Sequence, residues 1–138
     1  MFGDLSVEKD FLENFMLTDG KAYERGFFPE VYPGRKQKMS DIGISNWSFW
    51  LLLELEEYVH RSKDRAFVEK SRERVSACVE GMLSYRGESG LLENLPNQFV
   101  DWSIANKPFN LYPISVANNC LAVYALEKMA ELYGVENW

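Results

Sequence analysis

The chain has 138 residues, 46% of them hydrophobic and 26% charged, and its 15 basic and 21 acidic residues give a formal net charge of −6. A chain of this length can bury a core without staples, and two cysteines provide neither a disulfide framework nor a zinc site. The acidic balance argues against binding nucleic acid or an anionic membrane, because both select basic surfaces. No run of about 18 apolar residues predicts a membrane span, and the first residues lack the features of a signal peptide, so we expect a soluble chain.

The first half of the sequence predicts two helices. Apolar residues at Phe11, Leu12, Phe15 and Met16 follow one helical face within residues 6–17, with Ser6 as the expected N-cap. A second helix is expected from residue 45 to about residue 60. Its first two turns, residues 47–53, are apolar nearly all round, which is typical of a helix packed on several sides.

The second half predicts two more helices. Asp64 is expected to cap a helix whose apolar residues keep the 3.6-residue period from Phe67 to Leu83. Ser115 is expected to open the last helix, with Gly134 in the left-handed position after its end. No segment predicts a strand, so the expected fold class is all-α.

The connections between these helices differ greatly in length. Only residues 61–63 separate the second and third helices, which predicts an antiparallel hairpin. Residues 18–44 and 86–112 instead form two 27-residue connections with no clear period. Connections of this length are usually functional or disordered, and their large apolar residues favour order. If consecutive helices are antiparallel, both connections lie at the same end of the fold.

That end combines aromatic rings with carboxylates, which is the chemistry of a sugar site. An aromatic ring packs on the apolar face of a pyranose, while carboxylates accept hydroxyl hydrogen bonds and serve as acid and base in glycoside hydrolysis. Neither a cofactor nor a metal ion is expected, because the sequence contains no glycine-rich phosphate motif and no metal-ligand cluster. The candidate substrate-binding residues are Trp47, Trp50, Asp101 and Trp102, with Glu30, Tyr32 and Asp41 nearby.

Each candidate also has a structural interpretation. Trp47 and Trp50 begin an apolar stretch and could be core residues, and Asp101 could simply form a turn. Trp102 lies beside an acidic residue in a long connection, which leaves a structural and a binding role about equally favoured.

Four other residues are given structural roles. His60 suits the C-terminal end of a helix. Cys78 and Cys120 lie on apolar faces and are expected to be buried thiols. The glycosylation sequon at Asn46 falls at the start of a buried helix and is interpreted as accidental.

An ordered set of segments resembles a known family. These segments are Gly-Phe-Phe-Pro-Glu-Val-Tyr-Pro at 26–33, Ile-Ser-Asn-Trp-Ser-Phe-Trp at 44–50, Gly-Leu-Leu at 90–92 and Phe-Val-Asp-Trp at 99–102. Together with the apolar face at 11–16 and the alanine-rich last helix, they resemble the six-hairpin glycosidase domain of α-L-rhamnosidases. The resemblance extends over about residues 8–134 and implies an (α/α)6 toroid, of which this chain would supply two hairpins.

The resemblance also implies roles for individual residues. Trp47 matches the tryptophan at the start of an inner helix that contacts the sugar, and Asp101 with Trp102 matches an Asp-Trp pair at the active-site end. The family's general acid, in a stretch of Arg-Asp-Glu-Arg type, and its general base have no counterpart in this chain. The family also usually has an acidic residue close after this tryptophan, whereas this chain continues with Ser48, Phe49 and Trp50, so the catalytic residues stay unknown.

Two hypotheses follow. In the first, residues 1–138 are a fragment of an inverting, rhamnosidase-like hydrolase that carries part of the wall for a carbohydrate substrate. Such a fragment is expected to be inactive alone and to self-associate through uncovered helix faces. In the second, the chain is a complete four-helix module that binds a ligand or a protein partner.

Overall fold

The chain is all-α. A computed structural model describes residues 3–18, 26–32, 44–100 and 112–138. Within these ranges the regular structure is helical, apart from one isolated bridge between Arg86 and Leu92. No helix in the described part of the chain is both long and apolar enough to cross a membrane. The helices are α1 (Ser6–Met16), α2 (Ser45–Ser62), α3 (Arg65–Leu83) and α4 (Val116–Tyr133).

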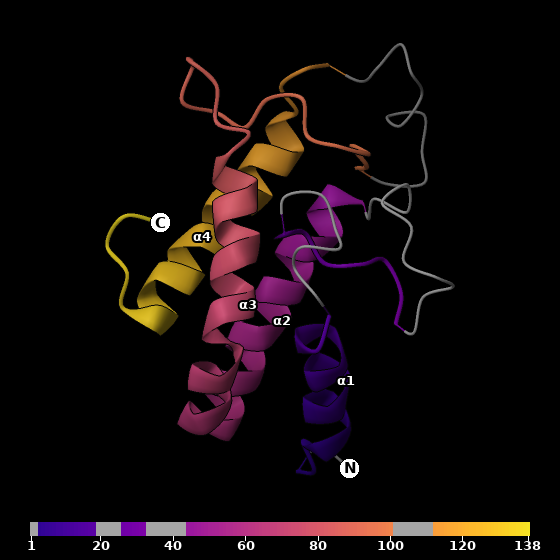
Figure 1. Cartoon of the computed structure of the whole chain (residues 1–138), viewed down its shortest axis with the longest axis vertical. Coiled ribbons are helices and arrows are strands. Elements are labelled where there is room, and N and C mark those ends of the chain that lie inside the picture. The colour runs from indigo at the N-terminus through magenta and orange to yellow at the C-terminus, as the bar shows by residue number, and fades with distance from the viewer. Residues whose placement is uncertain (1–2, 19–25, 33–43, 101–111) are drawn as a thin grey trace.

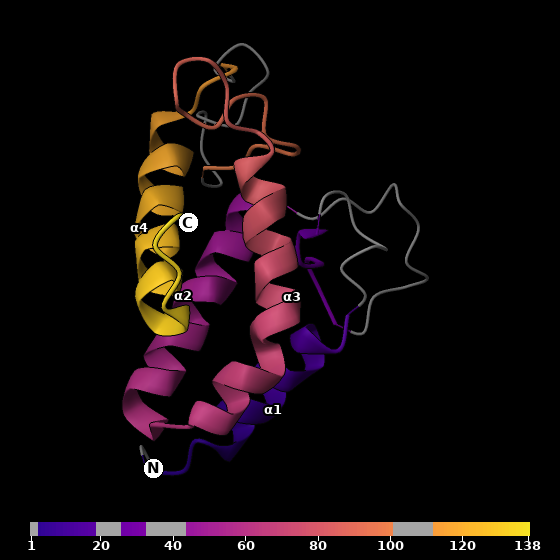
Figure 2. The same cartoon turned by 60° about the vertical axis from the view of Figure 1, so that its left-hand side comes forward.

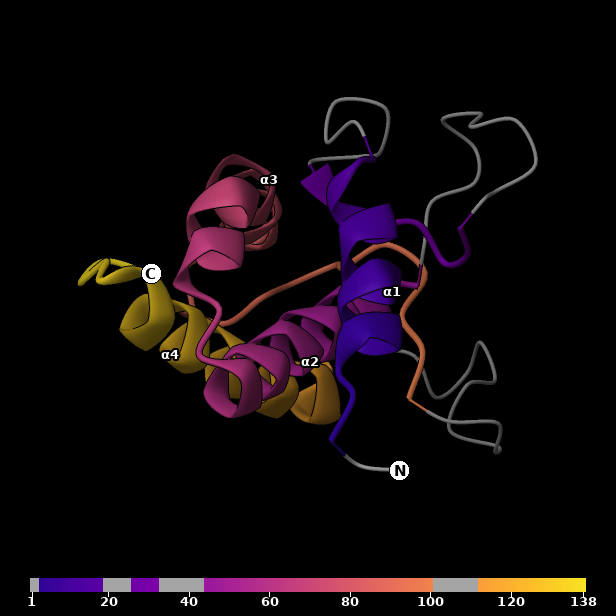
Figure 3. The same cartoon turned by 90° about the horizontal axis from the view of Figure 1, so that it is seen from below.

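The helices alternate in direction. The chain runs up α1, down α2, up α3 and down α4 in the orientation of Figure 1, and the turned view in Figure 2 shows the same alternation. Seen from below, α2 lies between α1 and α4, with α3 on a neighbouring side (Figure 3). As predicted, both long connections leave from one end of the fold, and α2 and α3 form the expected hairpin.

The turn between α2 and α3 is organised by Asp64. Its Oδ1 atom accepts the Phe67 amide at 3.0 Å, which confirms the predicted N-cap. Its Oδ2 atom accepts from Lys9 Nζ at 2.7 Å and from the Tyr58 hydroxyl at 3.1 Å. Lys63 precedes it in the left-handed conformation with φ of 58°. The connection is therefore only Lys63 and Asp64, slightly later than predicted.

The predicted capping of α4 is confirmed, whereas that of α1 is wrong. Ser115 Oγ accepts the Asn118 amide, and Gly134 ends α4 in the left-handed conformation. In α1, Ser6 is the first helical residue, and Leu5 occupies the cap without a side-chain bond. The Ser6 amide instead donates to Asp4 Oδ1 at 2.9 Å. An acidic side chain two residues upstream therefore takes the role expected of Ser6.

The core lies where α2 packs against α3 and α4. Phe49, Leu52 and Leu55 of α2 are almost fully buried, as are Val75 and Met82 of α3. The two long connections also contribute buried apolar residues, as their composition predicted. Among the described residues of the connections, the buried large apolar ones are Phe27, Phe28, Leu92 and Leu95.

Candidate functional site

An aromatic groove opens on the side of α2 that faces away from this core. It has a volume of about 500 Å³ and lies between α1, the segment of residues 26–32 and the first turns of α2. Five of its lining residues are aromatic and two are glutamates. The lining residues are Phe11, Phe15, Phe28, Pro29, Glu30, Trp47, Trp50, Leu51 and Glu54.

The α2 wall of the groove carries two exposed tryptophans. Trp47 is 37% and Trp50 58% exposed, so their interpretation as core residues is wrong. Their spacing of three residues places both rings on one face of the helix. Ser48 and Phe49 between them are buried on the opposite side. The predicted pair of tryptophans therefore lines one groove, together with Glu30 from the first connection.

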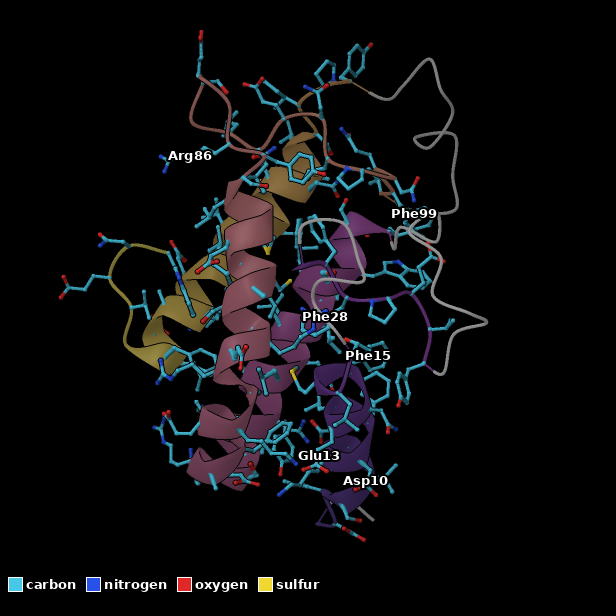
Figure 4. All side chains as sticks on the ribbon, viewed as in Figure 1. Asp10, Glu13, Phe15, Phe28, Arg86 and Phe99 are labelled. Atoms are coloured by element: carbon cyan, nitrogen blue, oxygen red, sulfur yellow. The ribbon has the colours of Figure 1, made fainter. Side chains whose placement is uncertain are left out.

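The opposite wall consists of rings from α1 and the first connection. Phe11 and Phe15 lie one helical turn apart, with ring centroids separated by 4.9 Å. Phe15 also lies 6.2 Å from the ring of Tyr32, which is 40% exposed. Figure 4 shows Phe15 at the end of α1 close to Phe28, and both residues line the groove. The groove thus presents aromatic surface from two sides, which suits a ligand with a flat apolar face.

The segment that holds Phe28 passes tightly against α3. Gly26 has φ of +80°, and a Cβ atom there would lie 2.3 Å from the Ala77 carbonyl oxygen. The next residue, Phe27, is 1% exposed and contacts the rings of Phe49 and Tyr85. Only glycine permits both this backbone conformation and this close approach.

A buried arginine fastens this segment from behind. Arg74 of α3 is 7% exposed and donates to the carbonyl oxygens of Gly26 at 2.6 Å and Phe27 at 2.9 Å. Its guanidinium carbon lies 3.9 Å from the centroid of the Phe28 ring. The Phe28 amide in turn donates to Ser48 Oγ of α2 at 2.9 Å. Contacts from α2 and α3 therefore fix both the backbone and the ring of Phe28 at the base of the groove.

Two carboxylates complete the lining. Glu30 is exposed at the edge of the segment, and Glu54 lies one turn beyond Trp50 on α2. Burial raises the pKa of Glu54 above its ordinary value, and the neighbouring Glu8 carboxyl adds to this rise through repulsion and a hydrogen bond. Arg61 partly offsets the rise from its ion pair with Glu8. A carboxyl group accepts hydrogen bonds when ionised and can also donate one when protonated.

Several other candidates are not among the described residues that line the groove. Asp101, Trp102 and Asp41 lie outside the described residues, so their role stays a prediction. Asn46 is 5% exposed and donates to the Phe99 carbonyl oxygen at 2.5 Å, which removes it as a glycosylation acceptor in the folded chain. His60 is exposed in the last turn of α2.

The two cysteines differ from each other. Cys78 is fully buried in the core, and burial raises the pKa of its thiol to about 12, so it stays protonated and unreactive at neutral pH. Cys120 is exposed on α4, and its predicted burial is wrong. Cys120 shares one face of α4 with Val116, Val123 and Tyr124, which are exposed as well.

Comparisons with known proteins add no relative to this picture. No protein-family model matches the chain, and neither the curated proteins nor the solved structures give a significant match. Among the described residues, no group of three or more histidine, cysteine, aspartate or glutamate side chains could hold a metal ion. The described lining of the groove offers five aromatic rings and two carboxylates.

Proposed function

We propose that this chain is part of a glycoside hydrolase similar to the α-L-rhamnosidases, and that the aromatic groove forms part of its sugar-binding wall. The observation that carries the proposal is the exposed pair Trp47 and Trp50 in a groove that also contains Glu30 and Glu54. Stacking on an indole ring and hydrogen bonds to carboxylates are complementary to the two faces of a pyranose. Large exposed aromatic rings gathered in a concave site are also typical of ligand binding.

The outer helices support the view that the chain is a piece of a larger helical toroid. Val7 on α1 is 77% exposed, and Val116 on α4 is 75% exposed. Further along α4, Val123 and Tyr124 are each 51% exposed. In an (α/α)6 toroid, adjacent hairpins would cover both of these flanks. In the alternative, a complete four-helix module, these residues would face solvent or a protein partner. Sizing chromatography distinguishes the two, because a fragment with uncovered flanks is expected to self-associate and a complete module to be monomeric.

Calorimetric titration with L-rhamnose and other neutral monosaccharides tests the sugar-binding wall. We expect weak binding, and Trp50→Ala should reduce the affinity about 3- to 10-fold because a stacked ring is lost. Tyr124→Ala is the matched control, since it removes an aromatic ring of similar exposure on α4, outside the groove. The proposal is contradicted if no sugar binds, or if both variants lose affinity equally.

Hydrolysis is tested separately with a chromogenic α-L-rhamnoside. An inverting mechanism requires two carboxylates on either side of the bond with space for a water molecule. This chain lacks the family's acid and base stretches, so we expect no release of the chromophore by the purified chain. Sustained turnover would show that the catalytic groups lie within these residues and would contradict the assignment of a binding wall alone.

A further inference from the structure

A single buried side chain connects the two elements that form the groove wall opposite α2, namely α1 and the segment of residues 26–32. Arg74 Nε donates to Thr18 Oγ1 at 3.2 Å, and Thr18 Oγ1 in turn donates to the Phe15 carbonyl oxygen at 2.6 Å. This path leads to the α1 part of that wall. The same guanidinium donates to the Gly26 and Phe27 carbonyl oxygens, which belong to the other part, the segment of residues 26–32.

The contact with Phe28 adds a direct link to the lining. The Arg74 guanidinium lies over the Phe28 ring at 3.9 Å, and this ring is 2% exposed beneath the groove. A planar guanidinium can stack on a ring and donate several in-plane hydrogen bonds at once, which a lysine ammonium cannot do. Arg74 itself is not among the residues that line the groove.

We infer that Arg74 is a positioning residue, which sets the separation of Phe15 and Phe28 and thereby the shape of the groove wall that faces the tryptophans of α2. The identity of the ligand in this inference rests on the proposed function, whereas the positioning of the two rings rests on the contacts of Arg74 alone. A site whose supporting contacts are loosened by a fraction of an ångström loses affinity although every lining residue is still present. The chain therefore recognises its ligand through a residue that does not touch it.

The test compares Arg74→Lys with Ser71→Ala. Ser71 precedes Arg74 by one turn of α3, is fully buried, and exchanges a hydrogen bond with the Tyr133 hydroxyl at 2.9 Å, on the side away from the groove. Affinity for the sugar is measured by calorimetry at a temperature at which both variants are folded. We expect Arg74→Lys to bind about tenfold more weakly and Ser71→Ala to bind within about twofold of the parent chain.

Hydrogen exchange at the Phe28 amide gives a second measurement that needs no ligand. This amide donates to Ser48 Oγ, so its exchange reports whether the segment stays in place. Arg74→Lys should accelerate its exchange, while Ser71→Ala should leave it unchanged. If Arg74→Lys does not fold, Thr18→Val serves instead, because it removes only the hydroxyl that connects Arg74 to the Phe15 carbonyl oxygen of α1.

The outcomes separate this inference from the proposed function. Unchanged exchange in the Arg74 variant overturns the positioning role, whatever the ligand. Faster exchange with unaltered affinity overturns the claim that this position governs binding. If the parent chain binds no sugar, the proposed function fails, while the exchange measurement still decides the geometry.

Discussion

The turn between α2 and α3 and the aromatic groove are both held by polar side chains, yet they depend on different parts of the chain. Asp64 caps a helix that begins at the next residue, and two of its three partners, the Phe67 amide and the Tyr58 hydroxyl, are three and six residues away, while the third is Lys9 of α1. Arg74 fastens Thr18, Gly26 and Phe27, which are 47 to 56 residues away. The cap of α3 therefore depends on residues that are near in the sequence, whereas the groove requires that α1, α3 and the first connection pack together.

This difference predicts unequal tolerance to substitution. The turn has several contributions that act separately, so the loss of one leaves the hairpin in place. The groove depends on close backbone approach and one buried cation, so a single change displaces an entire wall. The predictions below test this contrast, from the largest expected effect to the smallest.

Gly26→Ala should be the most damaging substitution. The new Cβ atom would lie 2.3 Å from a backbone oxygen of α3, at a φ of +80°. We expect a loss of about 3 kcal/mol in the free energy of unfolding, measured by urea denaturation. Gly90→Ala is the control, because Gly90 has φ of +82° but its nearest neighbour is a side-chain nitrogen at 3.9 Å. Equal losses at the two positions would mean that the approach to α3 is unimportant.

Asp64→Ala should cost about 1–2 kcal/mol, because it removes the N-cap of α3 together with the acceptor of Lys9. The pKa of Asp64 lies below its ordinary value because of the hydrogen bond from Lys9 and then that from the Phe67 amide. Its stabilisation is therefore present above the unfolded pKa of about 3.8 and is lost as the pH falls through the folded pKa.

Denaturation of the parent chain and Asp64→Ala at neutral and acidic pH measures this loss. The difference between the two proteins should shrink at acidic pH. A difference that does not depend on pH would rule out the ionised carboxylate as its source.

Glu54→Gln should change the free energy of unfolding least, and it should raise this free energy rather than lower it. Burial and the Glu8 carboxyl raise the pKa of Glu54 in the folded chain. The protonated side chain therefore contributes stability that is fully present below the pKa of Glu54 in the unfolded chain. This contribution is lost as the pH rises through the pKa in the folded chain. At neutral pH the uncharged variant should be more stable, by no more than about 0.5 kcal/mol because the side chain is partly exposed.

Thermal unfolding at pH 4 and pH 7 checks the effect of Glu54→Gln, with the exposed Glu88→Gln as control. A gain at pH 7 that also occurs with Glu88→Gln would contradict a specific cost at the groove. A gain confined to Glu54→Gln would mean that the chain retains a carboxylate that destabilises it, as binding sites commonly do.

The sequence predicted the helices well because their signals are local. The 3.6-residue period and the caps Asp64, Ser115 and Gly134 all act within a few residues of each helix end. The cap of α1 was wrong because Asp4 competes with Ser6, and the period does not distinguish between them. Local signals therefore predict where the helices lie in the sequence, but not which faces of these helices pack together.

The groove could be predicted only in part. The apolar stretch at the start of α2 predicted a helix packed on several sides. It does not indicate which side the other helices leave uncovered, so the exposure of Trp50 could not be predicted. Glu54 was missed although a signal existed, since it follows Trp47 by seven residues and Trp50 by four. The burial of Arg74 could not be predicted, because its acceptors are backbone oxygens almost 50 residues away.

The most direct test of the groove as a sugar site is the indole N–H region of the NMR spectrum during titration with a neutral monosaccharide. Trp138 packs on Tyr133 outside the groove and provides an internal reference. The indole signals of Trp47 and Trp50 should shift together and saturate, while that of Trp138 stays in place. Unmoved signals from Trp47 and Trp50, or an equal shift of Trp138, would contradict the assignment of this groove as the binding wall.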